Sequence, residues 1–196
     1  MSVLKFKLSG QAFDMPETTK AIIRLGKRWR KNARISLKMQ DKINTGGLYD
    51  SIPVDVFEQK GVYYLDITPQ AHYWEFVDKG VQGASRNIFK GQEQSPFKFG
   101  SGKGPKGLRG AIDKWVLQRG ISGTRDAKGR FTTRKQTVWA ISNAIYNRGL
   151  KPTFFISGTH QRIKKSLNKE VGPAFSKDVA NALRTIISNN ENTEVN

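Results

Sequence analysis

The stretch PQAHYWEFVDKGVQG, residues 69–83, decides which fold we expect this chain to adopt. Tyr73, Phe76 and Val77 stand at i, i+3 and i+4, which is the spacing of one face of a short helix. Gly80 follows at a position where a glycine commonly ends a helix. By itself this pattern is typical of a helix turn in a core, so its meaning depends on the sequence around it.

Trp74 points away from that face, next to a pair of acidic residues. Glu75 and Asp78 are three residues apart on one turn, where two carboxylates could act as acid and base or bind a divalent ion. No third ligand stands nearby in the sequence. A salt bridge to a basic residue is therefore the favoured interpretation.

A long helix is predicted upstream, over residues 16–42. Asp14 followed by Glu17 predicts a capping box at its start. Its buried stripe recurs every three or four residues and consists of Ile22, Leu25, Trp29, Ala33 and Leu37. The other faces are strongly basic, and the residues expected to contact DNA phosphates or an acidic neighbouring subunit are Arg24, Arg28, Lys31 and Arg34. The alternative is a solvated basic face.

Three strands are predicted, over residues 3–8, 48–57 and 62–68. Leu48 opens the second strand after a glycine turn, and Ile52 is one of its apolar residues. We expect the three strands to form one small antiparallel sheet, covered on one face by the long helix. The fold class is therefore α+β.

Residues 80–107 hold seven glycines and no long apolar pattern, which is typical of a functional loop or a mobile arm. Phe97 is expected to anchor this segment to the sheet. The Lys/Gly run fails the Walker pattern, because neither Lys103 nor Lys106 is followed by Ser or Thr. These two lysines remain candidate phosphate contacts, at the start of a helix predicted over 108–119.

A second basic segment follows at residues 120–135. Its candidate contacts to DNA or to the next subunit are Arg125, Lys128 and Arg130; the alternative is a disordered surface loop. Another helix is predicted over 137–148. An extended passage follows, in which Pro152 excludes a helix before it and Phe154, Phe155 and Ile156 are expected to dock in the core. A last helix begins near Ile163 and is expected to break at Gly172-Pro173.

This pattern predicts a single domain. Residues 1–80 and 150–188 are expected to form an α+β core, residues 81–149 a basic insertion of loops and a helix, and residues 189–196 a frayed tail.

Composition narrows the function classes. The net charge is +18, and its sign alternates along the chain. Residues 16–42 carry nine basic and two acidic residues, and residues 43–82 carry two basic and six acidic residues. Residues 83–135 carry thirteen basic and three acidic residues. Such a chain suits an anionic partner or head-to-tail contacts between its own copies. Cysteine is absent and the two histidines have no companion ligand, so we expect no metal, no cofactor and no enzyme activity. No apolar run reaches the length of a membrane span.

Three motifs occur in a characteristic order. They are Thr45-Gly-Gly-Leu-Tyr-Asp-Ser-Ile52, then the stretch from Tyr73 to Gly80, then Lys151-Pro-Thr-Phe-Phe155. In this order they resemble the tail-completion or neck proteins of long-tailed bacteriophages, and the basic segment between the second and third motifs departs from that family.

The resemblance implies a structural virion protein of the neck, made in the cytoplasm of the host bacterium. It implies a ring, hexameric in that family, that joins the capsid connector or stopper to the tail-terminator or tail-tube proteins and leaves a channel for genomic DNA. The residues expected to serve structure or interfaces are Leu48, Ile52, Tyr73, Trp74, Phe76, Val77, Gly80, Phe97, Pro152, Phe154 and Phe155. The alternatives are a sequence-neutral nucleic-acid-binding protein and, less favoured, a nuclease.

Overall fold

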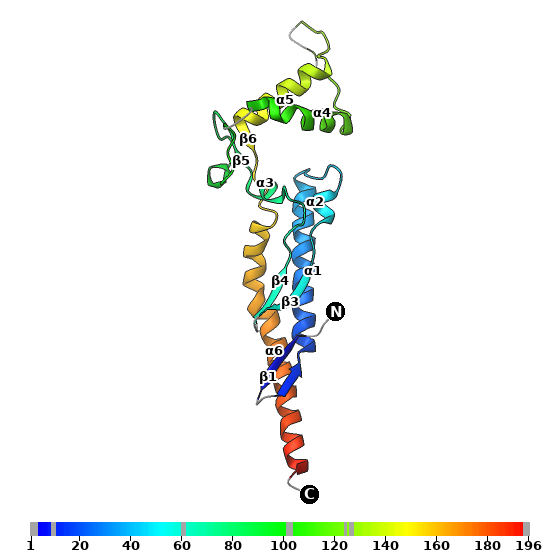
Figure 1. Ribbon diagram of the computed structural model, residues 1–196, viewed down its shortest axis with the longest axis vertical. Coiled ribbons are helices and arrows are strands. Elements are labelled where there is room, and N and C mark those ends of the chain that lie inside the picture. Colours follow the sequence, from blue (N-terminus) through cyan, green and yellow to red (C-terminus); the bar gives the residue numbers. More distant parts are fainter. Residues whose placement is uncertain are drawn as a thin grey trace. The chain divides into compact units, whose positions relative to one another are not determined.

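A computed structural model of the chain describes all residues except 1–3, 9–10, 60–61, 101–103, 124, 126–127 and 194–196. The fold is α+β, as predicted: a long N-terminal and a long C-terminal helix pack together, and the strands form small antiparallel pairs (Figure 1). The chain divides into two compact units. Unit 1 comprises residues 1–35, 52–68 and 156–196, and unit 2 comprises residues 36–51 and 69–155. The sequence-based grouping instead placed residues 36–51, 69–80 and 150–155 with the core.

Unit 1 is built on two long helices that run side by side, α1 (Pro16–Met39), whose last turn belongs to unit 2, and α6 (Ser157–Thr193) (Figure 1). The predicted apolar stripe of α1 is confirmed, since Leu25 and Ala33 are fully buried. Gly26 lets the backbone of α1 approach the neighbouring strands. A Cβ at this position would lie 2.6 Å from Val54 and 2.7 Å from Leu65.

The strands of unit 1 form two separate hairpins. β1 (Lys5–Leu8) pairs with β2 (Gln11–Asp14), and β3 (Asp55–Gln59) pairs with β4 (Val62–Asp66). The predicted single three-stranded sheet is therefore wrong. The first predicted strand pairs locally with residues 11–14, where sequence reasoning placed no strand.

Leu48 was predicted to open a strand, and that prediction is wrong. It lies buried in α2 (Gly47–Asp50), a helical turn that follows Gly46 in the left-handed conformation. The strand begins only at Asp55, after Pro53, which has no N–H to give to a sheet. Ile52 is buried as expected, but outside the strand.

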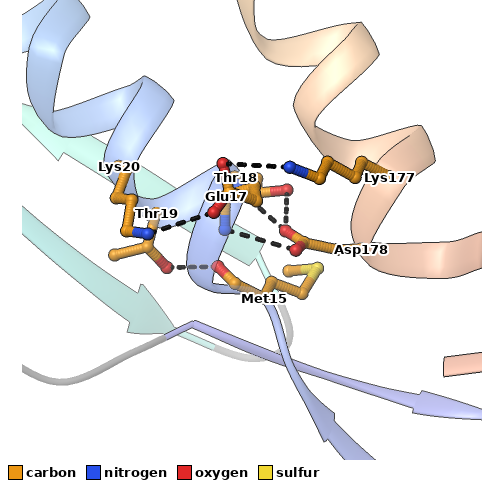
Figure 2. Close-up of polar contacts among 7 residues, drawn as sticks. All are labelled: Met15, Glu17, Thr18, Thr19, Lys20, Lys177 and Asp178. Atoms are coloured by element: carbon orange, nitrogen blue, oxygen red, sulfur yellow. Dashed lines mark hydrogen bonds and ion pairs between the residues drawn. The ribbon is translucent and has the colours of Figure 1, made fainter. Parts of the chain in front are cut away.

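The start of α1 is held by α6 and not by its own flank. The carboxylate of Asp178 accepts hydrogen bonds from the N–H groups of Glu17 (3.2 Å) and Thr18 (2.8 Å) and from the Thr18 hydroxyl (2.8 Å), as Figure 2 shows. The predicted cap, Asp14, lies one residue too early and pairs with Lys5 at 3.7 Å. The capping function therefore comes from a residue more than 150 positions away.

The first turn of α1 also carries ion pairs that shift the pKa of Glu17. Lys20 donates a hydrogen bond of 3.0 Å to Glu17, and Lys177 lies 3.9 Å from it (Figure 2). The hydrogen bond from Lys20, and then the charge of Lys177, lower the pKa of Glu17 below its ordinary value.

α6 runs without a break, which corrects the predicted interruption at Gly172-Pro173. Pro173 lies inside the helix. A proline here removes one N–H, but both residues are exposed, so water can satisfy the carbonyl that loses its partner. The helix also continues to Thr193, so most of the predicted frayed tail is helical and only residues 194–196 lie outside the described chain.

Unit 2 contains the remaining elements. They are α2, α3 (Trp74–Lys79), β5 (Val81–Gln82), the 3-10 turns η1 (Gln92–Gln94) and η2 (Gly104–Leu108), α4 (Arg109–Gln118), α5 (Arg134–Arg148) and β6 (Gly149–Leu150). The predicted helices over 108–119 and 137–148 correspond to α4 and α5. α5 starts with a capping box between Thr133 and Gln136 and ends at Gly149, whose φ is 81°. α4 and α5 pack against each other, and Val116 of α4 and Val138 of α5 are buried.

Candidate assembly site

The second and third motifs are joined by hydrogen bonds between their backbones. The N–H of Thr153 lies 3.2 Å from the carbonyl of Val77 and 3.1 Å from that of Asp78, and the N–H of Phe154 lies 2.9 Å from the latter. The Thr153 hydroxyl adds a bond of 2.8 Å to the Val77 carbonyl. The carbonyls at the end of α3 are thus satisfied by the extended passage before α6, which fixes the two motifs to each other.

Gly80 makes this junction possible. Its φ of 70° and ψ of −171° belong to a region that only glycine adopts readily. A Cβ here would lie 2.6 Å from the carbonyl oxygen of Leu150 and 2.7 Å from the nitrogen of Pro152. The predicted role of this glycine as a helix end is confirmed, and the structure adds close backbone packing.

Ser51 of the first motif bonds to the two residues that lie shortly before the second motif. Its backbone carbonyl accepts a hydrogen bond from the N–H of Gln70 at 3.1 Å, and its hydroxyl accepts one from the N–H of Ala71 at 3.4 Å. Residues 45–51, 69–80 and 150–155, far apart in the sequence, therefore form one framework within unit 2.

An apolar groove of about 620 Å³ lies beside this framework in unit 2. We call it the aromatic groove. Its lining residues are Asp41, Lys42, Asn44, Tyr73, Phe76, Val77, Ala111, Ile112, Trp115, Arg119, Ile145, Leu150 and Lys151. The predicted stripe of Tyr73, Phe76 and Val77 thus forms one wall instead of a sealed core, with Tyr73 39% and Phe76 42% exposed. Exposed aromatic side chains in a concave apolar surface are typical of a protein contact.

One rim of the groove is fixed by polar bonds. Arg119 donates to the carbonyl of Ile43 at 2.8 Å and to the carboxylate of Asp41 at 3.2 Å, and Asn44 donates to Gln118 at 2.6 Å. These contacts hold the loop after α1 against the end of α4. The groove is therefore preformed on this side, which reduces the entropy cost of binding a partner.

One of the anchors of residues 83–100 is a polar side chain that sequence reasoning missed. Gln92 is completely buried. Its amide donates to the carbonyls of Val81 and Arg148 at 2.7 Å each, and its oxygen accepts from the N–H groups of Ile88 and Phe89 at 3.1 and 3.2 Å. Of the two interpretations made from sequence, these bonds favour a fixed loop over a mobile arm.

Phe97 also anchors this loop, but against α3 and β5 and not against the three-stranded sheet that was expected. Its ring centroid lies 4.3 Å from that of Phe76, and the Lys79 ammonium lies 6.0 Å from the ring centre of Phe97. The backbone around Phe97 pairs with Gln82 of β5 in parallel orientation. The N–H of Gln82 donates to the carbonyl of Phe97, and the N–H of Phe99 donates to the carbonyl of Gln82, each at 2.8 Å. Phe97 is thereby tied to the wall of the aromatic groove.

The other candidate interface residues have different surroundings. Trp74 is half-buried, whereas Pro152 and Phe155 are buried, the latter completely. Phe154 was expected to dock in the core, but it remains 39% exposed and has a φ of 50°. The prediction of core docking is therefore wrong for Phe154, whereas Phe155 is buried and Ile156 is half-buried.

The carboxylate pair of the second motif does not form a shared site. Glu75 pairs with Lys79 at 2.8 Å, which confirms the favoured salt bridge, while Asp78 is almost fully buried. Among the described residues no group of three or more His, Cys, Asp or Glu side chains is placed to hold a metal ion. Nor is any helix in the described ranges long and apolar enough to cross a membrane.

The candidate basic contacts are spread over both units. Arg24 and Lys31 of α1 are exposed, Arg28 forms an ion pair with Glu170, and Arg34 is half-buried. In unit 2, Lys106 is exposed in η2, while Lys103 lies outside the described residues.

The second basic segment includes a short hairpin. Arg125 bridges Phe131 in antiparallel orientation, donates to the carbonyl of Gly129 at 2.9 Å, and stacks its guanidinium 4.4 Å from the Phe131 ring centre. Lys128 and Arg130 are exposed beside it. The predicted tip includes residues 126–127, which lie outside the described chain.

Sequence reasoning missed one set of basic residues. They are exposed in the first half of α6: Arg162, Lys164, Lys165 and Lys169. α6 runs beside α1 (Figure 1). Both long helices of unit 1 therefore carry exposed basic side chains. The density of lysines in residues 162–169 was a signal that could have identified them.

Comparisons of this chain with protein-family models, with curated proteins and with solved structures found no match.

Proposed function

We propose that this chain is a structural subunit of the neck of a long-tailed bacteriophage virion. Copies of the chain form a ring, hexameric as the motif resemblance implies, between the capsid connector and the tail, and DNA passes through its opening. The observation that supports this proposal best is the framework of unit 2. The second and third motifs are bonded to each other, the first is bonded to residues 70–71 shortly before the second, and the second and third also line an exposed apolar groove.

In this proposal the aromatic groove is the contact surface for a neighbouring subunit. Tyr73, Phe76 and Trp115 offer large apolar areas in a preformed hollow, and such residues dominate the energy of protein contacts. Ring closure needs heterologous contacts, in which one surface of a copy meets a different surface of the next. The alternation of acidic residues 43–82 with basic flanking stretches suits such contacts.

The decisive experiment replaces Tyr73 by Ala in the infecting phage. Because Tyr73 is partly exposed in the groove, its loss should leave the fold intact and produce full heads and free tails that fail to join. Trp139→Ala is the matched control, since Trp139 is 56% exposed on α5 and does not line the groove. Normal virions from the Tyr73 variant would contradict the proposed role of the groove. Phe155→Ala is a poor test, because removing a fully buried phenylalanine costs about 3–5 kcal/mol of stability.

The second candidate function is sequence-neutral binding of nucleic acid. It is favoured by the exposed basic side chains on both helices of unit 1, including Arg24, Lys31 and Lys165. Binding through phosphate contacts would weaken steeply as salt rises, and reversing the charges at residues 24–34 would abolish it. Tight binding of duplex DNA at physiological salt, together with virion assembly that tolerates loss of the protein, would favour this function over the neck.

A further inference from the structure

The second half of α6 has an outward face that is apolar. We call Phe175, Val179, Leu183 and Ile187 the α6 ridge. They are spaced four residues apart, which places them in one row along the helix. Phe175 and Leu183 are each 46% exposed and Ile187 is 57% exposed. Contiguous exposed apolar side chains of this size on a helix mark a contact surface.

A hollow of about 520 Å³ lies at the N-terminal end of this ridge, within unit 1. Its walls include Val56, Tyr63 and Leu65 of the β3–β4 hairpin and Leu167, Val171 and Phe175 of α6. Phe175 belongs to both the hollow and the ridge. α6 therefore lines a hollow at Val171 and Phe175. It also carries exposed apolar side chains, Leu183 and Ile187, that could fill the hollow of another copy.

The distribution of charge along α6 indicates which kind of partner can bind the α6 ridge. Residues 174–189 are all described and carry three charged side chains. Lys177 lies 3.9 Å from Glu17, and Asp178 is buried against the start of α1 (Figure 2). Arg184 and Lys177, whose side chain is 65% exposed, are the charges of this segment that a partner could meet. In a chain of net charge +18, this is a segment where a second copy can approach with little repulsion.

We propose that the α6 ridge pairs with the α6 ridge of a second copy, the two helices antiparallel about a two-fold axis near Val179. Leu183 then packs against Phe175 of the partner subunit, and Ile187 reaches Val171 of the partner subunit at the mouth of the hollow. Two-fold symmetry repeats both contacts, so each hollow is filled by the other copy.

The antiparallel orientation follows from the basic first half of α6. With the axis near Val179, the Lys169 residues of the two copies are separated by about twenty residues of helix, roughly 30 Å at 1.5 Å per residue. That distance is about three Debye lengths at ordinary ionic strength, so their repulsion is screened. A parallel pair would instead place the lysines of residues 164–169 side by side.

This contact is inferred independently of the proposed function, because a head-to-tail ring does not require a two-fold pair. The exposed parts of the ridge amount to a few hundred Å² per copy, less than the roughly 800 Å² per partner of a standard interface. We therefore expect a dimer that dissociates in the micromolar range.

Cross-linking through single cysteines tests the geometry, because the chain contains no cysteine of its own. Phe175→Cys and Leu183→Cys proteins are prepared separately and treated with a short thiol cross-linker, alone and mixed. The antiparallel pair predicts a strong cross-link only in the mixture, between one variant and the other. Equal cross-linking of each variant with itself would overturn the orientation, and no cross-link in any sample would overturn the contact.

Sedimentation of the purified protein tests the energetics. The fraction of copies paired should rise over the micromolar range, and Leu183→Asp should lower it at least tenfold. Ser188→Asp is the matched control: it adds the same charge five residues on, about 140° round the helix, and should change nothing. Ile187→Asp repeats the test near the helix end, where a charge disturbs folding least. Pairing unaffected by both ridge variants would refute the proposal, whereas rings that persist in the Leu183 variant would leave the neck function untouched.

Discussion

Replacing Gly80 by alanine tests whether the three motifs form a rigid framework. The backbone conformation at Gly80, φ 70° and ψ −171°, costs about 1–3 kcal/mol for any residue with a Cβ. The added Cβ would also lie 2.6 Å from the Leu150 oxygen and 2.7 Å from the Pro152 nitrogen. Both are backbone atoms that no rotamer change can move, and overpacking of this kind costs about 1–3 kcal/mol more. We expect a total loss of about 2–6 kcal/mol from the stability of unit 2.

Urea unfolding followed by tryptophan fluorescence measures this loss. Trp74, Trp115 and Trp139 lie in unit 2 and Trp29 lies in unit 1, so a Trp29→Phe background makes the signal specific for unit 2. With a slope of about 2 kcal/mol per molar urea, a loss of 3 kcal/mol lowers the midpoint by about 1.5 M.

The matched control is Gly110→Ala in α4. No atom lies within 4 Å of a Cβ built there, and alanine favours the helix, so the midpoint should stay or rise by the equivalent of up to about 1 kcal/mol. If the Gly80 variant unfolds at the same urea concentration as the unchanged protein, the close packing between the second and third motifs does not exist.

Three further predictions concern polar groups. Asp178→Ala should lower the free energy of unfolding by about 1–3 kcal/mol in thermal or chemical unfolding, because it leaves the first N–H groups of α1 without an acceptor. The control Asp14→Ala should change this free energy by less than about 0.5 kcal/mol. Equal effects of the two variants would show that Asp14 is the cap. Gln92→Ala should speed hydrogen exchange of the loop amides at residues 88–89 at least tenfold. Gln94→Ala, at an exposed position, is the control. Unchanged exchange in the Gln92 variant would show that Gln92 does not hold the loop. Because the pKa of Glu17 is lowered in the folded chain, its contribution to stability is present above its ordinary pKa of 4.5 and is lost as the pH falls through the lowered value. Glu17→Gln should remove that part of the pH dependence of stability. A pH profile identical to that of the unchanged protein would contradict this role of Glu17.

The helices were predictable because their signals are local. The stripe from Ile22 to Leu37, the Tyr73–Gly80 turn and the end of α5 at Gly149 all follow from residue spacing and from glycine stereochemistry. Fold class followed from the same patterns.

The errors arose where distant residues override local preference. Asp14 has the sequence pattern of a cap, but Asp178 performs that function after α6 folds back along α1. Pro173 predicts a helix break, yet its exposed position allows the helix to continue. Leu48 follows a glycine turn that suits either a strand or a helical turn, and the tertiary structure selects the helix.

One wall of the candidate site was predictable from the sequence, but the rest of its lining and its form were not. The sequence identified Tyr73, Phe76 and Val77 as one face, but not that this face borders an open groove with Trp115. The role of Gln92 was hidden, because a lone glutamine in a glycine-rich loop has no pattern that distinguishes a buried anchor from a solvated side chain.

Imaging the purified protein by negative-stain electron microscopy, with its native mass measured on the same sample, tests the neck proposal most directly. The proposal predicts a closed ring of several copies with an axial opening, and Tyr73→Ala should abolish the ring while Trp139→Ala preserves it. A protein that remains a single copy or a simple pair at all concentrations, and that binds duplex DNA tightly at physiological salt, would contradict it.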